Sequence, residues 1–328
     1  MRTMLRTREL ALALRDTSEE VQEFGEGSWT AIVYNGAAIP VKVTLDGVWV
    51  ALQAPSGVPA CGQDPWELLV LNGRIEGPSK FALDPGRFVP HLRAEVPLDD
   101  EVHLTSRLAA AFSGIRVGHA ALLSPQSGGE TPASRWDHVG QVGRSEDQRS
   151  VADRLRIDLT ELCNDSGWPF TEREGGSLAV DLGVRAGFQQ ARVTREGSGE
   201  TCASVSVARL GALPQVCRDA LGVFLLTACR LVRLARATID EQKGRSQVSF
   251  EVRLADPLSA GELGHALGAL SAACRHFAAE VVSLQVPAVA ERFLQLRGWP
   301  GRPASPLHQL RSAQVEDCVS RDSDQRSH

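Results

Sequence analysis

The stretch Trp66–Leu98, WELLVLNGRIEGPSKFALDPGRFVPHLRAEVPL, decides the fold, because a related stretch, GVFLLTACRLVRLARATIDEQKGRSQVSFEVRL, follows at Gly222–Leu254. A constant offset of 156 positions aligns six identities, which lie at Leu69, Arg74, Asp84, Glu95, Val96 and Leu98 of the first stretch. Both stretches show an apolar helical pattern, a short strand ending in Leu-Asp or Ile-Asp, and a second strand ending in Glu-Val-x-Leu. The sequence therefore predicts an internal duplication of one α+β unit.

The flanking patterns extend each stretch into a complete unit. In the first half, apolar periodicity predicts a helix at 4–16, strands at 31–34, 39–43 and 48–52, a helix from Asp64-Pro65, strands at 80–84 and 88–96, and a helix after 99. The second half repeats this order with a helix at 151–163, strands at 178–184, 188–194 and 202–207, a helix from Pro214, strands at 237–240 and 247–254, and a helix behind the capping box Ser259–Glu262. The predicted fold class is α+β, with two tandem α-β-β-β-α-β-β-α units and antiparallel sheets.

Composition shifts mark the boundaries of the units. Residues 124–150 are dense in Ser, Gly, Gln and charge and predict a flexible linker. After Pro300 the chain becomes polar and rich in proline, which predicts a disordered tail at 300–328. We therefore expect a first unit at 1–123 and a second unit at 151–299.

Overall composition limits the class of partner and the compartment. The chain is 43% hydrophobic and 23% charged, with 35 Lys+Arg against 40 Asp+Glu, which is typical of a globular protein and does not favour nucleic acid. Charges interrupt the N-terminal segment, and the longest apolar run, 220–229, is too short to span a bilayer, so we expect neither a signal peptide nor membrane binding. Seven cysteines without short pairings indicate reduced thiols in the cytoplasm.

The element order, with its LD…EVPL and ID…EVRL strand pairs, resembles the class I type III secretion chaperone fold (Tir chaperone, or CesT-like) and its YbjN-like relatives. The resemblance covers residues 4–122 and 151–299. Such chaperones are homodimers of one small unit, whose second helix packs across the two-fold axis. For this longer chain the resemblance implies a monomer that forms an intramolecular pseudo-dimer. The predicted contact lies between the helices at 65–76 and 214–235, with Leu69, Phe224 and Leu225 as inter-unit residues.

No catalytic, cofactor-binding or metal-ligating residues are predicted. The chain has no phosphate loop, no Gly-x-Gly-x-x-Gly after a strand, no Cys-x-x-Cys and no His-x-x-x-His. Cys274 and His276 share a helix but point to different faces. The repeated carboxylates, Asp84 with Glu95 and Asp240 with Glu251, are expected to be turn and outward strand residues rather than acid/base pairs. Arg74 and Arg230 are each expected to pair with a carboxylate inside their own unit.

Aromatic residues offer the best candidates for partner binding. Trp29, Trp49 and Trp66 have core packing as their ordinary role, but Trp49 and its neighbours on an exposed sheet face are able to receive an extended segment. Trp29 and Trp49 are the predicted partner-binding residues. We therefore hypothesise a non-catalytic, chaperone-like module that binds a protein or peptide segment. Two alternatives stay open: a small-molecule-binding protein or enzyme with a site assembled from distant strands, and a purely structural interaction protein.

Overall fold

The computed structural model describes residues 2–56, 64–84, 86, 88–98, 103–123, 159–184, 189–196, 200–242 and 245–299. Within these ranges the chain forms seven α-helices and two antiparallel six-stranded sheets, arranged in two similar halves. The predicted α+β class is confirmed. The predicted linker at 124–150 and the predicted tail at 300–328 lie outside the described residues.

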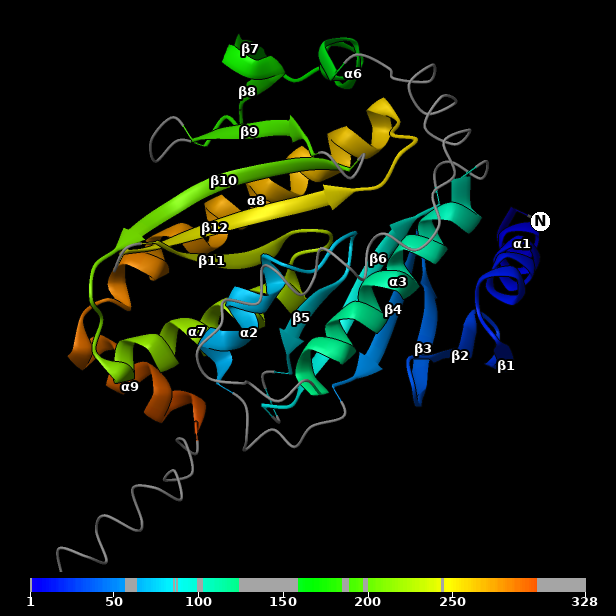
Figure 1. Ribbon diagram of the computed structural model, residues 1–328, viewed down its shortest axis with the longest axis horizontal. Coiled ribbons are helices and arrows are strands. Elements are labelled where there is room, and N and C mark those ends of the chain that lie inside the picture. The colour runs from blue at the N-terminus through cyan, green and yellow to red at the C-terminus, as the bar shows by residue number, and fades with distance from the viewer. Residues whose placement is uncertain are drawn as a thin grey trace, which may run out of the picture.

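The first unit is a sheet with two helices on one face (Figure 1). Its elements are α1 (Arg2–Thr17), β1 (Glu20–Gly25), β2 (Ser28–Tyr34), β3 (Ala38–Asp46), β4 (Trp49–Pro55), α2 (Pro65–Asn72), β5 (Lys80–Leu83), β6 (Pro90–Pro97) and α3 (Leu104–Leu123). The strand order is β1-β2-β3-β4-β6-β5. Alternate side chains of β2, β3 and β4 are buried, as expected when helices cover one face of a sheet.

The second unit repeats this plan. Its elements are α6 (Leu159–Ser166), β7 (Phe170–Arg173), a short 3-10 turn (Glu174–Gly176), β8 (Ser177–Asp181), β9 (Gln190–Arg195), β10 (Thr201–Leu210), α7 (Gln215–Leu231), β11 (Arg236–Gln242), β12 (Arg245–Leu254), α8 (Ala260–Ser283) and α9 (Pro287–Arg297). The strand order β11-β12-β10-β9-β8-β7 matches that of the first sheet read from β5. Helices α6 and α8 contact each other, and α8 packs on β10 and β12.

Each unit has one strand more than predicted. The sequence indicates three strands before the middle helix, whereas the structure has four, with β1 and β7 as the additions. Both lie at the outer edge of their sheets, and nearly all of their side chains are exposed or half-buried. The sequences EVQEFG and FTER therefore lack the alternation that identifies a half-buried strand. The correct order of each unit is α-β-β-β-β-α-β-β-α.

Several local signals are confirmed in detail. Asp64 caps α2 by accepting the backbone N–H of Trp66 at 2.9 Å, and Ser259 with Glu262 forms the predicted capping box of α8. The predicted meander is present as β2-β3-β4, and its turns contain Gly36 at φ 73° and Gly47 at φ 64°.

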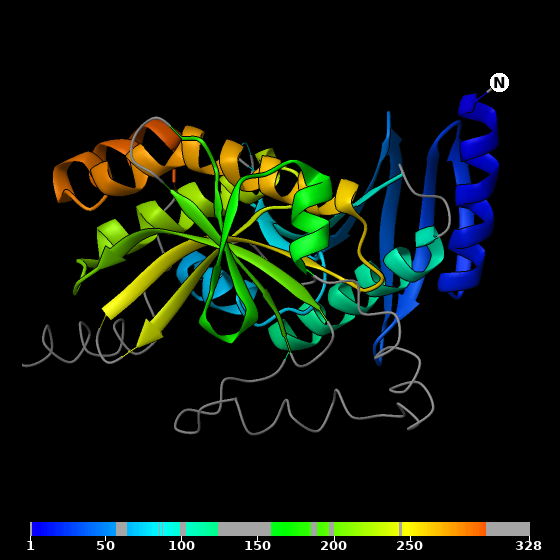
Figure 2. The same cartoon turned by 90° about the horizontal axis from the view of Figure 1, so that it is seen from above.

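The two middle helices lie between the two sheets (Figures 1 and 2). Helices α2 and α7 contact each other, and each also packs on the other unit: α2 on β11 and α7 on β5. Because β5 and β11 are edge strands of their sheets, each unit covers one sheet edge of the other. At the opposite edges, β1 and β7 each pair with one strand, and no strand of the described ranges pairs with their outer sides.

Candidate functional site

The middle helices bury the predicted inter-unit leucines. Leu69 of α2 and Leu225 of α7 are both 0% exposed. Phe224 is half-buried, and its ring lies edge-on to Phe277 of α8 and Phe293 of α9, with centroids 5.7 and 6.0 Å away. These ring contacts of Phe224 are made inside the second unit, and its contact with the first unit stays a prediction.

A buried ion pair of the first unit reaches into the second. Lys80 Nζ lies 3.0 Å from Glu95 Oε2, and the two side chains are 0% and 1% exposed. The same ammonium group donates hydrogen bonds to the carbonyl oxygens of Val232 and Ala235, at 2.7 and 3.1 Å. Glu95 Oε2 accepts the backbone N–H of Leu234 at 3.3 Å. This one pair therefore holds the loop between α7 and β11 at three points.

The second unit carries an ion pair at the matching positions. Arg236 and Glu251 follow Lys80 and Glu95 by the 156-residue offset of the repeat. Arg236 Nε donates to Glu251 Oε1 at 2.8 Å, and its Nη1 donates to the carbonyl oxygen of Ser79 at 2.8 Å. Lys80 and Arg236 thus each donate to the backbone of the other unit, just before its edge strand.

These contacts correct two predictions about the repeated carboxylates. Glu95 and Glu251, expected to face outward, are 1% and 8% exposed. The second unit covers the part of the first sheet that carries Lys80 and Glu95, and the sequence pattern of one unit alone does not reveal this contact. Lys80 and Arg236 were missed as well. Their available signal was a cation at the first position of the same strand in both repeats.

The charges of these pairs serve structure rather than proton transfer. Burial lowers the pKa of Lys80, and the Glu95 carboxylate opposes that shift. Burial alone would raise the pKa of Glu95, but attraction to Lys80 and Arg93 outweighs it and lowers the pKa overall. Burial also lowers the pKa of Arg236, against the attraction of Glu251. A lowered pKa makes the Glu95 carboxylate a weaker base, and its burial keeps it away from any substrate.

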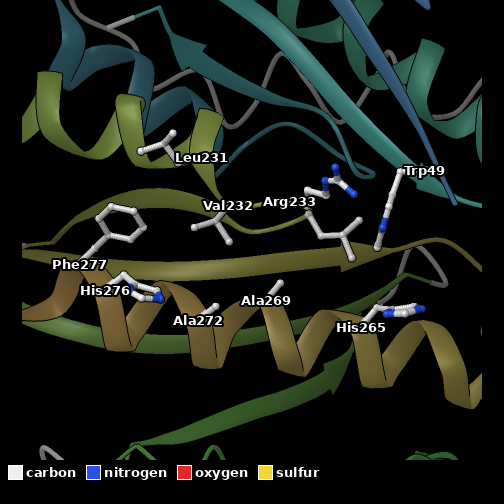
Figure 3. Close-up of a pocket in the computed structure, with 10 residues that line it drawn as sticks. Trp49, Leu231, Val232, Arg233, His265, Ala269, Ala272, His276 and Phe277 are labelled. Atoms are coloured by element: carbon white, nitrogen blue, oxygen red, sulfur yellow. The ribbon is translucent and has the colours of Figure 1, made fainter. Parts of the chain in front are cut away.

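The candidate site is an open hollow at the boundary between the units, which we call the Trp49 groove (Figure 3). Its volume is about 400 Å³. Trp49, at the start of β4, comes from the first unit, and the other lining residues come from the second. They are Leu231, Val232, Arg233, Leu234, His265, Ala269, Ala272, His276 and Phe277. Helix α8 presents its two alanines and two histidines along one wall, and the end of α7 with its following loop forms the other.

Charged and aromatic contacts fix the position of the Trp49 ring. The ring lies edge-on to His265 of α8, with centroids 5.3 Å apart, and the Arg233 guanidinium carbon is 5.6 Å from its centroid. Arg233 also pairs with Asp46, which lies opposite Trp49 in the β3–β4 register. Leu234, in the same loop, has φ 62°, an unusual value for a leucine, and the hydrogen bond of its N–H to Glu95 helps to hold it. The buried ion pair of the first unit therefore positions one wall of the groove.

The two predicted partner-binding tryptophans are separated by the sheet. Trp29 is 1% exposed and lies opposite Val43 in the register, on the face that packs against the helices. Its ring belongs to the core and cannot reach a partner, because successive side chains of a strand point to opposite faces. Trp49 lies on the other face and lines the groove.

The cysteines that the structure describes are buried in the core. Cys163, Cys202, Cys217, Cys229 and Cys274 are free and buried. Burial raises the pKa of the Cys163 thiol to about 11 and those of Cys202 and Cys274 to about 12, so these thiols are protonated at neutral pH. Cys274 faces the core whereas His276 lines the groove. The described ranges contain no group of three side chains able to hold a metal ion.

Arg230 joins the two units. Its Nη1 lies 3.5 Å from Asp84 Oδ2 of the first unit, so the expectation that it pairs inside its own unit is wrong. Both side chains are about one-third exposed, and we expect a contribution of at most about 1 kcal/mol from this pair.

Because His91 of β6 is buried, we expect the stability of the protein to depend on pH. Burial lowers its pKa to about 4, with Arg230 and Arg93 adding to the shift and Asp84 opposing it. The unfolded chain, with a histidine pKa of about 6.5, then binds the proton more strongly, so the free energy of unfolding falls by up to roughly 3 kcal/mol as pH drops from 6.5 to 4. Urea unfolding of His91→Gln should show a flatter pH profile than the parent over this window; parallel profiles would contradict the assignment.

No protein-family model matches the sequence, and no curated protein matches it significantly. In the part of the chain that the structure describes, no helix is both long enough and apolar enough to cross a membrane. Fold and site together define an α+β protein of two six-stranded units that share one apolar groove at their boundary.

Proposed function

We propose that this chain is a non-catalytic, chaperone-like protein-binding module of the cytoplasm that holds an extended or partly folded segment of another protein. The single observation that carries the proposal is the Trp49 groove. It is open to solvent and mostly apolar, and Leu231 on its wall is 63% exposed. Exposed apolar surface of this kind costs free energy in water, and a partner segment relieves that cost by covering it.

The groove also indicates the chemistry of the segment. Arg233 is its one charged lining residue, His265 and His276 add imidazole groups, and none of the ten lining residues is a carboxylate. Ala269 and Ala272 leave room for a backbone to approach α8. An apolar segment that carries an acidic residue therefore complements both the shape and the charge of the groove.

The fold supports the same proposal through the resemblance to type III secretion chaperones, whose role is to hold another protein. The ionisable groups buried within the described ranges favour it over an enzyme. Lys80 with Glu95 and Arg236 with Glu251 form ion pairs within their own units, and none of the four residues lines the groove. The free, buried cysteines are in keeping with a cytoplasmic setting.

A synthetic peptide series tests the proposal. Fluorescently labelled ten-residue apolar peptides carrying one Asp, one Lys or one Asn are titrated against the full chain, and binding is followed by fluorescence polarisation. We expect the Asp peptides to bind most tightly. Filling the groove with Ala272→Trp should weaken binding about tenfold or more, because the indole occupies the space of a partner side chain. Arg233→Glu should invert the preference between the Asp and Lys peptides.

Ala279→Trp is the matched control. Ala279 lies on the same helix and is exposed, but it does not line the groove, so this variant should bind like the parent. Equal losses in Ala272→Trp and Ala279→Trp would contradict a role for the groove. Absence of binding for all three peptide types at millimolar concentration would contradict the function. A metabolite that raises the melting temperature of the parent but not of Ala272→Trp would instead favour a small-molecule binder.

A further inference from the structure

Trp66 of the first unit is anchored in the second. Its side chain is 2% exposed, and its indole Nε1–H donates to Glu241 Oε1 at 2.8 Å. The guanidinium carbon of Arg218 lies 4.9 Å from the Trp66 ring centroid, and Arg218 Nη2 lies 3.7 Å from Glu241 Oε1. The second unit therefore supplies a stacking cation and a hydrogen-bond acceptor for this one aromatic ring.

In the second unit, the position that corresponds to Trp66 is a glycine, and its surroundings leave no room for a side chain. Gly222 follows Trp66 by the repeat offset of 156 positions. A Cβ atom built on Gly222 would lie 2.7 Å from the Cβ of Pro65 and 3.0 Å from the backbone nitrogen of Trp66. Helices α2 and α7 are thus in tight contact at a position where one repeat has a tryptophan and the other has a glycine.

The first unit lacks the residues that receive the ring. The positions 156 residues before Arg218 and Glu241 are Gly62 and Pro85, which carry neither a guanidinium nor a carboxylate. A contact between two first units would place Trp66 where Gly222 now stands and would offer no acceptor for either indole. A contact between two second units would keep the Glu241 acceptor in each unit but would have no tryptophan to donate to it.

We infer that the contact surface between the units is selective for unlike partners: a first unit fits a second unit and rejects another first unit. The Lys80 and Arg236 contacts do not make this distinction, because both cations donate to backbone carbonyls that any residue supplies. The Trp66 anchor and the space at Gly222 do make this distinction. Trp49 belongs to the first unit and α8 to the second, so the Trp49 groove forms only when a first unit pairs with a second unit.

Cutting the chain between the units tests the inference. A protease site is inserted at Gly128-Gly129, between α3 and α6, and the full chain is purified and then cut. Unlabelled and ¹⁵N-labelled cut proteins are unfolded in urea, mixed and refolded together, and the pairs are identified by native mass spectrometry. We expect first–second pairs only, with both isotopes mixed between units. Random pairing would instead place about half of all pairs in first–first and second–second species, and that result would overturn the inference.

Variants of Trp66 and of Glu241 show whether a loss of pairing comes from the lost anchor or from a unit that fails to fold. In the cut protein, Trp66→Ala should weaken the first–second pair roughly 30-fold or more, because a buried aromatic anchor is lost. Glu241→Ala should weaken it less, and Glu241→Gln, which keeps an amide oxygen as acceptor, should restore the affinity. Glu241 is exposed, so its variants report on the contact even if Trp66→Ala does not fold. Pairing that is unchanged by Glu241→Ala, or not restored by Glu241→Gln, would overturn the role of the anchor. Neither result depends on peptide binding, so the inference and the proposed function fail separately.

Discussion

Leu225→Asp is expected to lower the free energy of unfolding by at least about 4 kcal/mol, a large part of the roughly 5–15 kcal/mol that is typical of folded proteins. Leu225 is 0% exposed and lies on α7, which packs against α2, α9 and the edge strand β5. A carboxylate at this position loses its hydration, and the apolar contacts of the leucine that it replaces are left unfilled. Urea unfolding followed by circular dichroism measures the change.

Leu231→Asp is the matched control for this prediction. The same substitution on the same helix places the carboxylate at a side chain that is 63% exposed, so we expect a change of at most about 0.5 kcal/mol. Because Leu231 lines the Trp49 groove, the control should still lose affinity for acidic peptides. If Leu225→Asp melts with the parent, α7 does not pack between the sheets as described.

The sequence predicts the interior of each unit better than its edges. The offset that aligns Glu95-Val96-Pro97-Leu98 with Glu251-Val252-Arg253-Leu254 is real in the structure, since β5 begins at Lys80 and β11 begins at Arg236, 156 residues later. The caps at Asp64 and Ser259 and the turns at Gly36 and Gly47 are equally local signals, and the structure confirms them. The missed strands β1 and β7 pair with one neighbour only and face water on most sides, so burial imposes no pattern on their residues.

The candidate site was predictable only in part, because its parts come from both units. Trp49 stands out in the sequence as an aromatic residue beside a turn, but nothing local tells whether its ring faces the helices, as Trp29 does, or the second unit. Glu95 looks like an outward residue of an alternating strand. Its burial depends on Leu234 and Lys80, which lie in different units and become neighbours only when α2 and α7 cross.

Glu95→Ala is expected to cost about 3–5 kcal/mol of unfolding free energy, because it leaves Lys80 buried without its counter-ion. The pKa of Lys80, already lowered by burial, should fall further in this variant. The unfolded chain then binds the proton more strongly than the folded one, so the stability of Glu95→Ala should recover as pH rises from 7 to 10, whereas the parent should show no comparable gain. Urea unfolding of both proteins across this range measures the effect.

Two further variants show whether the loss comes from the buried charge or from the missing side chain. Lys80→Met with Glu95→Gln removes both charges and should recover most of the stability, since a neutral pair of similar volume has no desolvation cost of this size. Glu19→Ala breaks the exposed pair with Arg116 and should cost less than about 1 kcal/mol. One outcome is a double variant that is as stable as the parent and yet binds peptides poorly. In that case the two charges serve chiefly to hold Leu234 and the wall of the Trp49 groove. If Glu95→Ala is no less stable than Glu19→Ala, water reaches Lys80 and the boundary between the units is looser than its hydrogen bonds indicate.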